Sequence, residues 1–216
     1  MKRKTIAALF KRNKWLTIYT APNGEQWISN GAAMYSMRGM PHMTPEVILR
    51  IFDIPPDKHQ SWLCHEKEMP ISIDCRDNVS VESEIEPLKI NIEWLGKKYW
   101  FFPDEWRLHS FDEDYIKPLL DEPDYLTYHK RHTTGGGFVL ACKVGFELRA
   151  ILLPSMLNND KGYMGEMKRI IGLYSATENE ANFVNAADEL FKDNEEHLPE
   201  VDPETGEVLE GQMELE

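Results

Sequence analysis

The sequence predicts an α+β fold in which an antiparallel sheet packs against a small number of helices. Short segments with alternating apolar residues recur along the chain, and Gly-containing turns separate them, which is typical of hairpins and meanders. Other segments space their apolar residues at helical intervals. The strongest local pattern runs from Tyr125 to Leu157, where two hairpin arms precede a third strand.

In this strongest pattern, Leu126 and Tyr128 alternate on the first arm and Phe138–Cys142 begins the return arm. The intervening Thr133–Gly137 turn contains residues that tolerate positive φ. The following apolar run, Phe146–Leu153, stops at Pro154, which predicts a strand buried on both faces.

The N-terminal part predicts a helix followed by a meander. Lys2–Lys14 has apolar residues at helical spacing and six basic residues with no acidic one. The Pro22–Gly24 and Asn30–Gly31 turns then divide Trp15–Met37 into three short strands.

The middle of the chain alternates between clear and unclear patterns. Thr44 and Pro45 open a helix that ends before Pro55–Pro56. Residues 57–87 predict only short strands and loops, whereas 88–102 predicts a hairpin that turns at Gly96. Residues 110–120 predict a helix that Pro118 shortens.

Three regions follow from these patterns and from the length of 216 residues, which exceeds the usual single-domain size. Residues 1–157 form the α+β domain. Residues 158–195 carry two apolar helical faces and predict a helical hairpin. Residues 196–216 are acidic, with few apolar side chains, and predict a disordered tail.

Charge separates the tail from the body. The chain carries 24 Lys and Arg residues against 37 Asp and Glu, a net charge of −13. Thr177–Glu216 contains 14 acidic residues and one basic residue, Lys192, so this segment alone carries the whole excess. Residues 1–176 are therefore neutral.

Cysteine usage and hydropathy predict a cytoplasmic protein. Cys64, Cys75 and Cys142 are odd in number and irregular in spacing, which favours reduced thiols over a disulfide framework. The apolar run Ile6–Phe10 is too short for a signal peptide, and no run approaches the length of a membrane span.

No residue set has the spacing of a catalytic, metal or cofactor site. His129 and His132 lie three apart on a predicted strand and point to opposite faces, so they predict no metal site with Cys142. A strand follows Gly135–Gly137, which predicts a turn instead of a phosphate loop. We therefore expect a protein that is not an enzyme and holds no metal or cofactor.

Two features suggest contact with nucleic acid. The first is the basic N-terminal helix, whose candidate DNA-binding residues are Lys2, Arg3, Lys4, Lys11, Arg12 and Lys14. The second is the aromatic-rich hairpin Trp94–Trp106, with Lys97 and Lys98 at its turn, although six aromatics are more often core residues than base-stacking ones.

The order of predicted elements resembles one domain of a DNA sliding clamp. The matching pieces are Thr5–Phe10 as first helix, Gln26–Tyr35 as a strand, Asn-Gly turn and strand, Phe111–Leu120 as second helix, and Ala150–Pro154 as closing strand. Clamps line a central hole with basic helices and contain two or three such domains in a chain. This chain has room for one, so ring closure either needs several subunits, as in a homo-oligomer, or does not occur.

Two functions of different class follow. The resemblance, together with an acidic tail similar to the ends of many phage recombination and replication proteins, implies a non-catalytic accessory or interaction protein of a phage or mobile element. Its expected partner is DNA or a DNA-processing protein, with no membrane. Alternatively, the acidic tail mimics nucleic acid and inhibits a host or defence protein.

Overall fold

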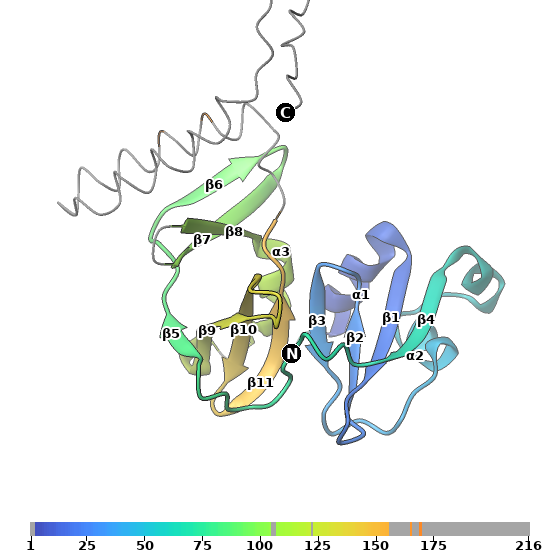
Figure 1. Cartoon of the computed structure of the whole chain (residues 1–216). Helices are drawn as coiled ribbons and strands as arrows, with labels where there is room; N and C mark the ends of the chain where they lie inside the picture. Colours follow the sequence, from blue (N-terminus) through green and yellow to red (C-terminus); the bar gives the residue numbers. More distant parts are fainter. Residues whose placement is uncertain (1–2, 105–106, 122, 156–164, 166–168, 170–216) are drawn as a thin grey trace, which may run out of the picture. The chain divides into compact units, whose positions relative to one another are not determined.

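The computed structural model describes residues 3–104, 107–121 and 123–155, together with Gly165 and Arg169 (Figure 1). The chain divides into two units, and the first, residues 1–104 and 108–160, is described below. The predicted helical hairpin 158–195 and tail 196–216 lie outside the described residues, apart from Gly165 and Arg169.

The first unit contains the same order of elements twice: a helix followed by three antiparallel strands. The first copy is α1 (Arg3–Asn13), β1 (Trp15–Thr20), β2 (Gln26–Ser29) and β3 (Ala33–Ser36). The second is α3 (Glu113–Ile116), extended by the 3-10 turn η2 (Lys117–Leu119), then β9 (Leu126–His132), β10 (Phe138–Val144) and β11 (Glu147–Leu152). This repeat was not evident from the sequence.

The two copies share one sheet of eight strands, ordered β4-β1-β2-β3-β11-β10-β9-β5. Its centre is the antiparallel pair of β3 and β11, in which Tyr35 faces Ala150. The predicted sheet was antiparallel throughout, and this is wrong at one edge, because β4 (Leu63–Glu68) runs parallel to β1. A parallel neighbour requires a long crossover, and residues 37–62 supply it through α2 (Pro45–Ile51) and the 3-10 helix η1 (Pro56–Ser61).

The remaining strands, β5 to β8, lie between the two copies of the repeat in the sequence. The short β5 (Ser83–Ile85) closes the other edge of the large sheet. A separate three-stranded sheet contains β6 (Asn91–Trp94), β7 (Lys97–Asp104) and β8 (Arg107–Asp112), and the 3-10 turn η3 (Pro123–Tyr125) precedes β9. The predicted hairpin over 88–102 is confirmed, with Gly96 at a φ of +72° in its turn.

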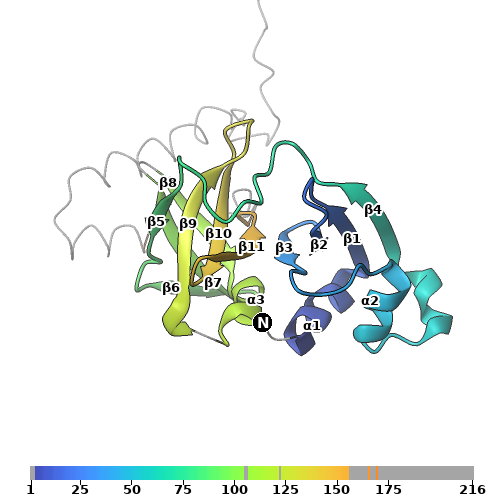
Figure 2. The ribbon, with the colours of Figure 1, turned by 90° about the horizontal axis from the view of Figure 1, so that it is seen from below.

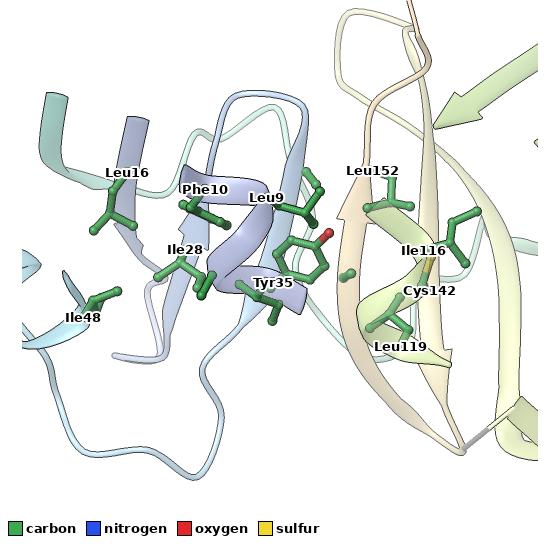
Figure 3. Packing of buried hydrophobic residues seen from close by; sticks show 14 of the residues in the cluster. Leu9, Phe10, Leu16, Ile28, Tyr35, Ile48, Ile116, Leu119, Cys142 and Leu152 are labelled. Carbon is green, nitrogen blue, oxygen red and sulfur yellow. The ribbon is translucent and has the colours of Figure 1, made fainter. Parts of the chain in front are cut away.

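One core lies between the helices and one face of the large sheet (Figure 3). Phe10 of α1 and Ile48 of α2 pack with the first three strands, while Ile116 and Leu119 cover the second half. Phe10 and Ile116 are both 0% exposed, so the helices of both copies of the repeat pack against the same face of the sheet. Among the described helices, none is long and apolar enough to cross a membrane.

The other face of the sheet carries a smaller core that the segment 69–82 covers in part. Met69, Ile73 and Cys75 pack against Trp27 and Val139. Figures 1 and 2 show this segment running from β4 to β5, the two edge strands of the sheet.

A buried arginine holds the segment 69–82 in place. Arg131 of β9 is 3% exposed, and its guanidinium donates to Glu82 and to the carbonyls of Asp74, Arg76 and Asp77. Lys143 pairs with the same Glu82 carboxylate. The segment is thus attached to the sheet by charge-assisted hydrogen bonds, the stronger kind.

Two details of the strand and helix predictions change. Phe146 is 89% exposed, because Gly145 with a φ of +61° places it in the β10–β11 turn; the buried run starts at Leu148. The predicted helix over 110–120 is only one α-helical turn followed by a 3-10 turn, in keeping with Pro118. Its N-cap is Asp112.

Candidate nucleic-acid interface

Helix α1 has one buried face and one basic face. Ile6, Ala7, Leu9 and Phe10 are buried against the sheet. Of the six candidate DNA-binding residues, Lys2 lies outside the described residues, and the other five are exposed: Arg3, Lys4, Lys11, Arg12 and Lys14. The helix thus holds these side chains at the surface by burying its opposite side.

Arg12 differs from the other basic residues because a carboxylate neutralises it. Its guanidinium lies 2.5 Å from Asp114 of α3, which joins the two helices of the repeat. Lys117 in η2 also pairs with Asp114, at 2.7 Å. Within the described part of the chain, Lys4, Lys11 and Lys14 have no carboxylate partner.

The acidic start of α3 is compensated in the same way. Asp112 is buried, accepts a hydrogen bond from the Asp114 amide as the N-cap, and lies 2.9 Å from the Lys97 ammonium. Glu113 pairs with Lys98 at 3.0 Å and with Lys117 at 3.1 Å. Each carboxylate of this turn therefore has a cationic partner.

The pKa of Asp114 reflects this environment. Burial is the largest single effect and acts to raise its pKa, but hydrogen bonds from Lys117 and Arg12 outweigh burial and lower it. Asp114 is therefore ionised at neutral pH and neutralises part of the basic surface around it.

These helices and the lysines paired with them define a surface that we call the helical face. It carries eight basic residues, Arg3, Lys4, Lys11, Arg12, Lys14, Lys97, Lys98 and Lys117, and three acidic ones, Asp112, Glu113 and Asp114. The ion pairs around the segment 69–82 on the opposite side contain four residues of each sign: Arg38, Arg76, Arg131, Lys143, Glu25, Asp74, Asp77 and Glu82. Basic residues therefore exceed acidic ones on the helical face but not among these pairs.

The aromatic hairpin serves chiefly as core. Tyr99, Phe101 and Phe102 are buried, and Trp100 is half-buried and donates its indole N–H to Glu113. Trp106 lies outside the described residues. Since Lys97 and Lys98 already pair with carboxylates, the turn of this hairpin offers less net charge to a phosphate than its sequence suggests.

Among the described residues, the histidines and cysteines form no ligand set. His129 Nε2 lies 3.0 Å from the Thr127 hydroxyl, whereas His132 lies 3.6 Å from Asp104. Burial raises the pKa of the Cys142 thiol far above its usual range and that of Cys75 to about 12. Across the part of the chain that the structure describes, no group of three His, Cys, Asp or Glu residues is arranged to hold a metal ion.

The Gly135–Gly137 segment is a hairpin turn, as predicted. The Gly136 and Gly137 amides donate to the backbone oxygen and hydroxyl of Thr133, at 2.8 and 3.0 Å. Because these donors are satisfied within the turn, they are not directed at an anion.

The structure has one hollow beside the helical face and another on the opposite side of the sheet. One, of about 250 Å³, lies between α1 and α2, where Ile6, Ile48 and Phe52 line it and Arg3 borders it. The other, of about 620 Å³, opens between the β1–β2 turn and the segment 69–82. Cys75 lines the second hollow, but its thiol donates to the sulfur of Met69 at 3.5 Å and its pKa is raised by burial and then by Asp74, so it is not an activated nucleophile.

No family model matches this chain, and no match was found among curated proteins or solved structures. The residues of the chain therefore carry the functional assignment. The sequence located the basic helix but missed Lys117 and the pairing of Lys97 and Lys98 with α3, because these partners meet only when the β6–β7 hairpin packs beside the second helix.

Proposed function

We propose that this protein is a non-catalytic accessory module that contacts DNA phosphates through its helical face, in a phage or mobile element. The observation that carries the proposal is the excess of eight basic over three acidic residues on that face of a neutral body. Phosphate contacts from Lys and Arg supply most of the sequence-independent affinity for DNA.

The geometry of α1 suits a run of phosphates. Its 11 residues extend over roughly 16 Å at 1.5 Å per residue. Four cations without a carboxylate partner among the described residues, Arg3, Lys4, Lys11 and Lys14, lie along or just beyond it. Releasing about four counterions would weaken binding roughly 100-fold between 50 and 200 mM salt.

The resemblance to a sliding-clamp domain supports the same role. Two copies of a helix followed by three strands, with both helices on one side of a shared sheet, agree with the element order on which the resemblance rests. Basic residues concentrated on α1 support a surface that faces DNA. Recruitment of a DNA-processing protein is the accessory activity that we infer from this arrangement.

Homo-oligomerisation is part of the proposal because the sheet has two edges. Among the described strands, β4 and β5 each have a neighbour on one side only. An unpaired edge is a template for another chain. Light scattering after size exclusion should give a mass above that of one 25.1 kDa chain, and a monomer at all concentrations would remove the ring from the proposal.

Charge reversal on α1 tests DNA contact. Lys4→Glu/Lys11→Glu should weaken binding of the full chain to a 20-base-pair duplex by more than tenfold at 50 mM salt. The matched control is Lys58→Glu/Lys89→Glu, which makes the same change in net charge at exposed lysines outside the helical face. If both double variants lose affinity equally, overall charge explains binding and the helical face does not.

The acidic-mimic alternative gives a different pattern. Its basis is the sequence of residues 177–216, with 14 acidic residues and one basic residue. If the chain binds no duplex at low salt, and a basic host protein binds the full chain but not the chain ending at 176, the accessory proposal fails and the mimic replaces it.

A further inference from the structure

The edge strands β1 and β4 carry contrasting side chains on their two faces. Leu16 and Ile18 of β1 point into the core beneath α1, so Trp15, Thr17 and Tyr19 lie on the opposite face. The parallel register places Leu63, His65 and Lys67 of β4 beside these three residues. Figures 1 and 2 show the two strands side by side at one end of the sheet.

The charges of β4 separate between the faces. Glu66 and Glu68 alternate with the exposed Lys67 and therefore lie on the side of α2, together with Cys64, whose pKa is raised by burial and then by Glu46 of that helix. On the opposite face, β1 and β4 present no carboxylate. We call this surface, made of Trp15, Tyr19, Leu63, His65 and Lys67, the platform.

Trp15 is held in a fixed orientation on the platform. Its indole N–H donates to the Thr17 hydroxyl at 2.9 Å, and its benzene ring lies against Gly31, where an added Cβ would be 3.8 Å from the ring. Gly31 has a φ of +91°, which the turn requires and which favours glycine. The indole nevertheless remains 40% exposed.

A large exposed aromatic side chain fixed by two contacts loses little conformational entropy when a ligand packs on it. Leu63, its neighbour in the register, is 54% exposed. Lys67, which lies opposite Tyr19 in the register, is exposed, with no carboxylate partner among the described residues. The platform thus combines ring surface with positive charge.

We propose that the platform binds an unpaired nucleic-acid strand, with one base stacked on Trp15 and a phosphate near Lys67. This inference rests on the proposed contact with DNA, and adds a second surface on the opposite side of the sheet from the core helices. Stacking on an aromatic ring combined with a basic track is the general chemistry of single-strand binding.

Two features favour an unpaired strand over a duplex or a peptide. The bases of a duplex stack on one another and offer no free face to Trp15. Leu63, beside Trp15 in the register, and Lys67 lie four residues apart on β4, about 13 Å, so a base on Trp15 and a phosphate near Lys67 would belong to a strand that runs along the sheet. Lys67 adds positive charge, which an apolar peptide would not need.

Fluorescence anisotropy of labelled dT15 and of a 15-base-pair duplex, titrated with the full chain at 50 mM salt, tests the proposal. Trp15→Ala should weaken dT15 binding about 5- to 150-fold, the range for loss of one stacked base. Trp15→Tyr should retain most of the affinity, and Lys67→Glu should reduce it. Phe146→Ala is the matched control, because this aromatic is 89% exposed but lies in the β10–β11 turn.

The outcomes separate this inference from the proposed function. If Trp15→Ala and Lys67→Glu both bind dT15 like the wild type, the platform is not a strand-binding surface, whether or not Lys4→Glu/Lys11→Glu loses the duplex. If Trp15→Ala weakens the duplex as much as dT15, recognition of an unpaired base is wrong. Should Trp15→Ala fold poorly by circular dichroism, Trp15→Tyr and Lys67→Glu still decide the question.

Discussion

Replacing Arg131 by methionine should destabilise the fold more than any exposed ion-pair change. The guanidinium is buried and donates to the Glu82 carboxylate at 2.7 Å and to three backbone carbonyls at 2.9 to 3.1 Å. Methionine fills similar space but leaves these acceptors without their donors. Removing one partner from a buried ion pair costs about 3–5 kcal/mol.

This cost is measurable as unfolding of the full chain in urea, followed by tryptophan fluorescence, with a parallel thermal scan. For a domain of this size, about 2–4 °C is lost per kcal/mol, so the Tm should fall by roughly 6–20 °C. Arg76→Met is the matched control, since the Arg76 side chain is 76% exposed and pairs with Asp74 at the surface. A surface pair contributes about 0–1 kcal/mol.

The result that would refute this reasoning is a free energy of unfolding for Arg131→Met within 1 kcal/mol of the wild type, or no lower than that of Arg76→Met. The segment 69–82 would then be held by its apolar contacts, and the buried guanidinium would contribute nothing net.

Three further predictions concern single groups. Burial is the largest single effect on the pKa of Glu82 and acts to raise it, but hydrogen bonds from Lys143 and Arg131 outweigh burial, so the pKa is lowered. The stabilisation by Glu82 is therefore complete above the unfolded pKa of about 4.3 and is lost as the pH falls through the lower folded pKa. Glu82→Gln should accordingly flatten the pH dependence of the urea midpoint between about pH 5 and pH 3. Cys142 is 0% exposed and should react with a thiol reagent only after unfolding, whereas half-buried Cys64 should react in the native protein; equal native rates would contradict the buried placement. Asp112→Ala removes both the N-cap of α3 and the partner of Lys97, and it should lower the free energy of unfolding by about 2 kcal/mol. An unchanged Tm would show that neither contact stabilises the fold.

The sequence predicted elements whose signals are local. The turn at Gly96 and the Asn30–Gly31 turn supply positive φ within a few residues, so their hairpins were found. Helix α2 begins at Pro45, after the predicted N-cap Thr44. Residues 57–87 were unclear because β4 pairs in parallel with the distant β1, a partner that no short pattern specifies.

The candidate site shows the same division between local and distant information. Six cations around one amphipathic helix could be read directly from residues 2–14. The contribution of Lys97 and Lys117 depends on where the second helix packs, and that is set by contacts between residues about 100 positions apart, as in Arg12 with Asp114. For the platform, the sequence offered only the alternation of Trp15, Thr17 and Tyr19 along one strand, which places these three side chains on the same face. It gave no sign that β4 lies beside them.

The salt dependence of duplex binding tests the central claim most directly. Affinity of the full chain for a 20-base-pair duplex should fall with salt at a slope of log K against log salt concentration of about −3 to −4, from four cations on the helical face. Lys4→Glu/Lys11→Glu should make this slope shallower, between about −2 and zero, while Lys58→Glu/Lys89→Glu should leave it unchanged. A slope near zero in the wild type, or one that the α1 variant does not alter, would contradict the account.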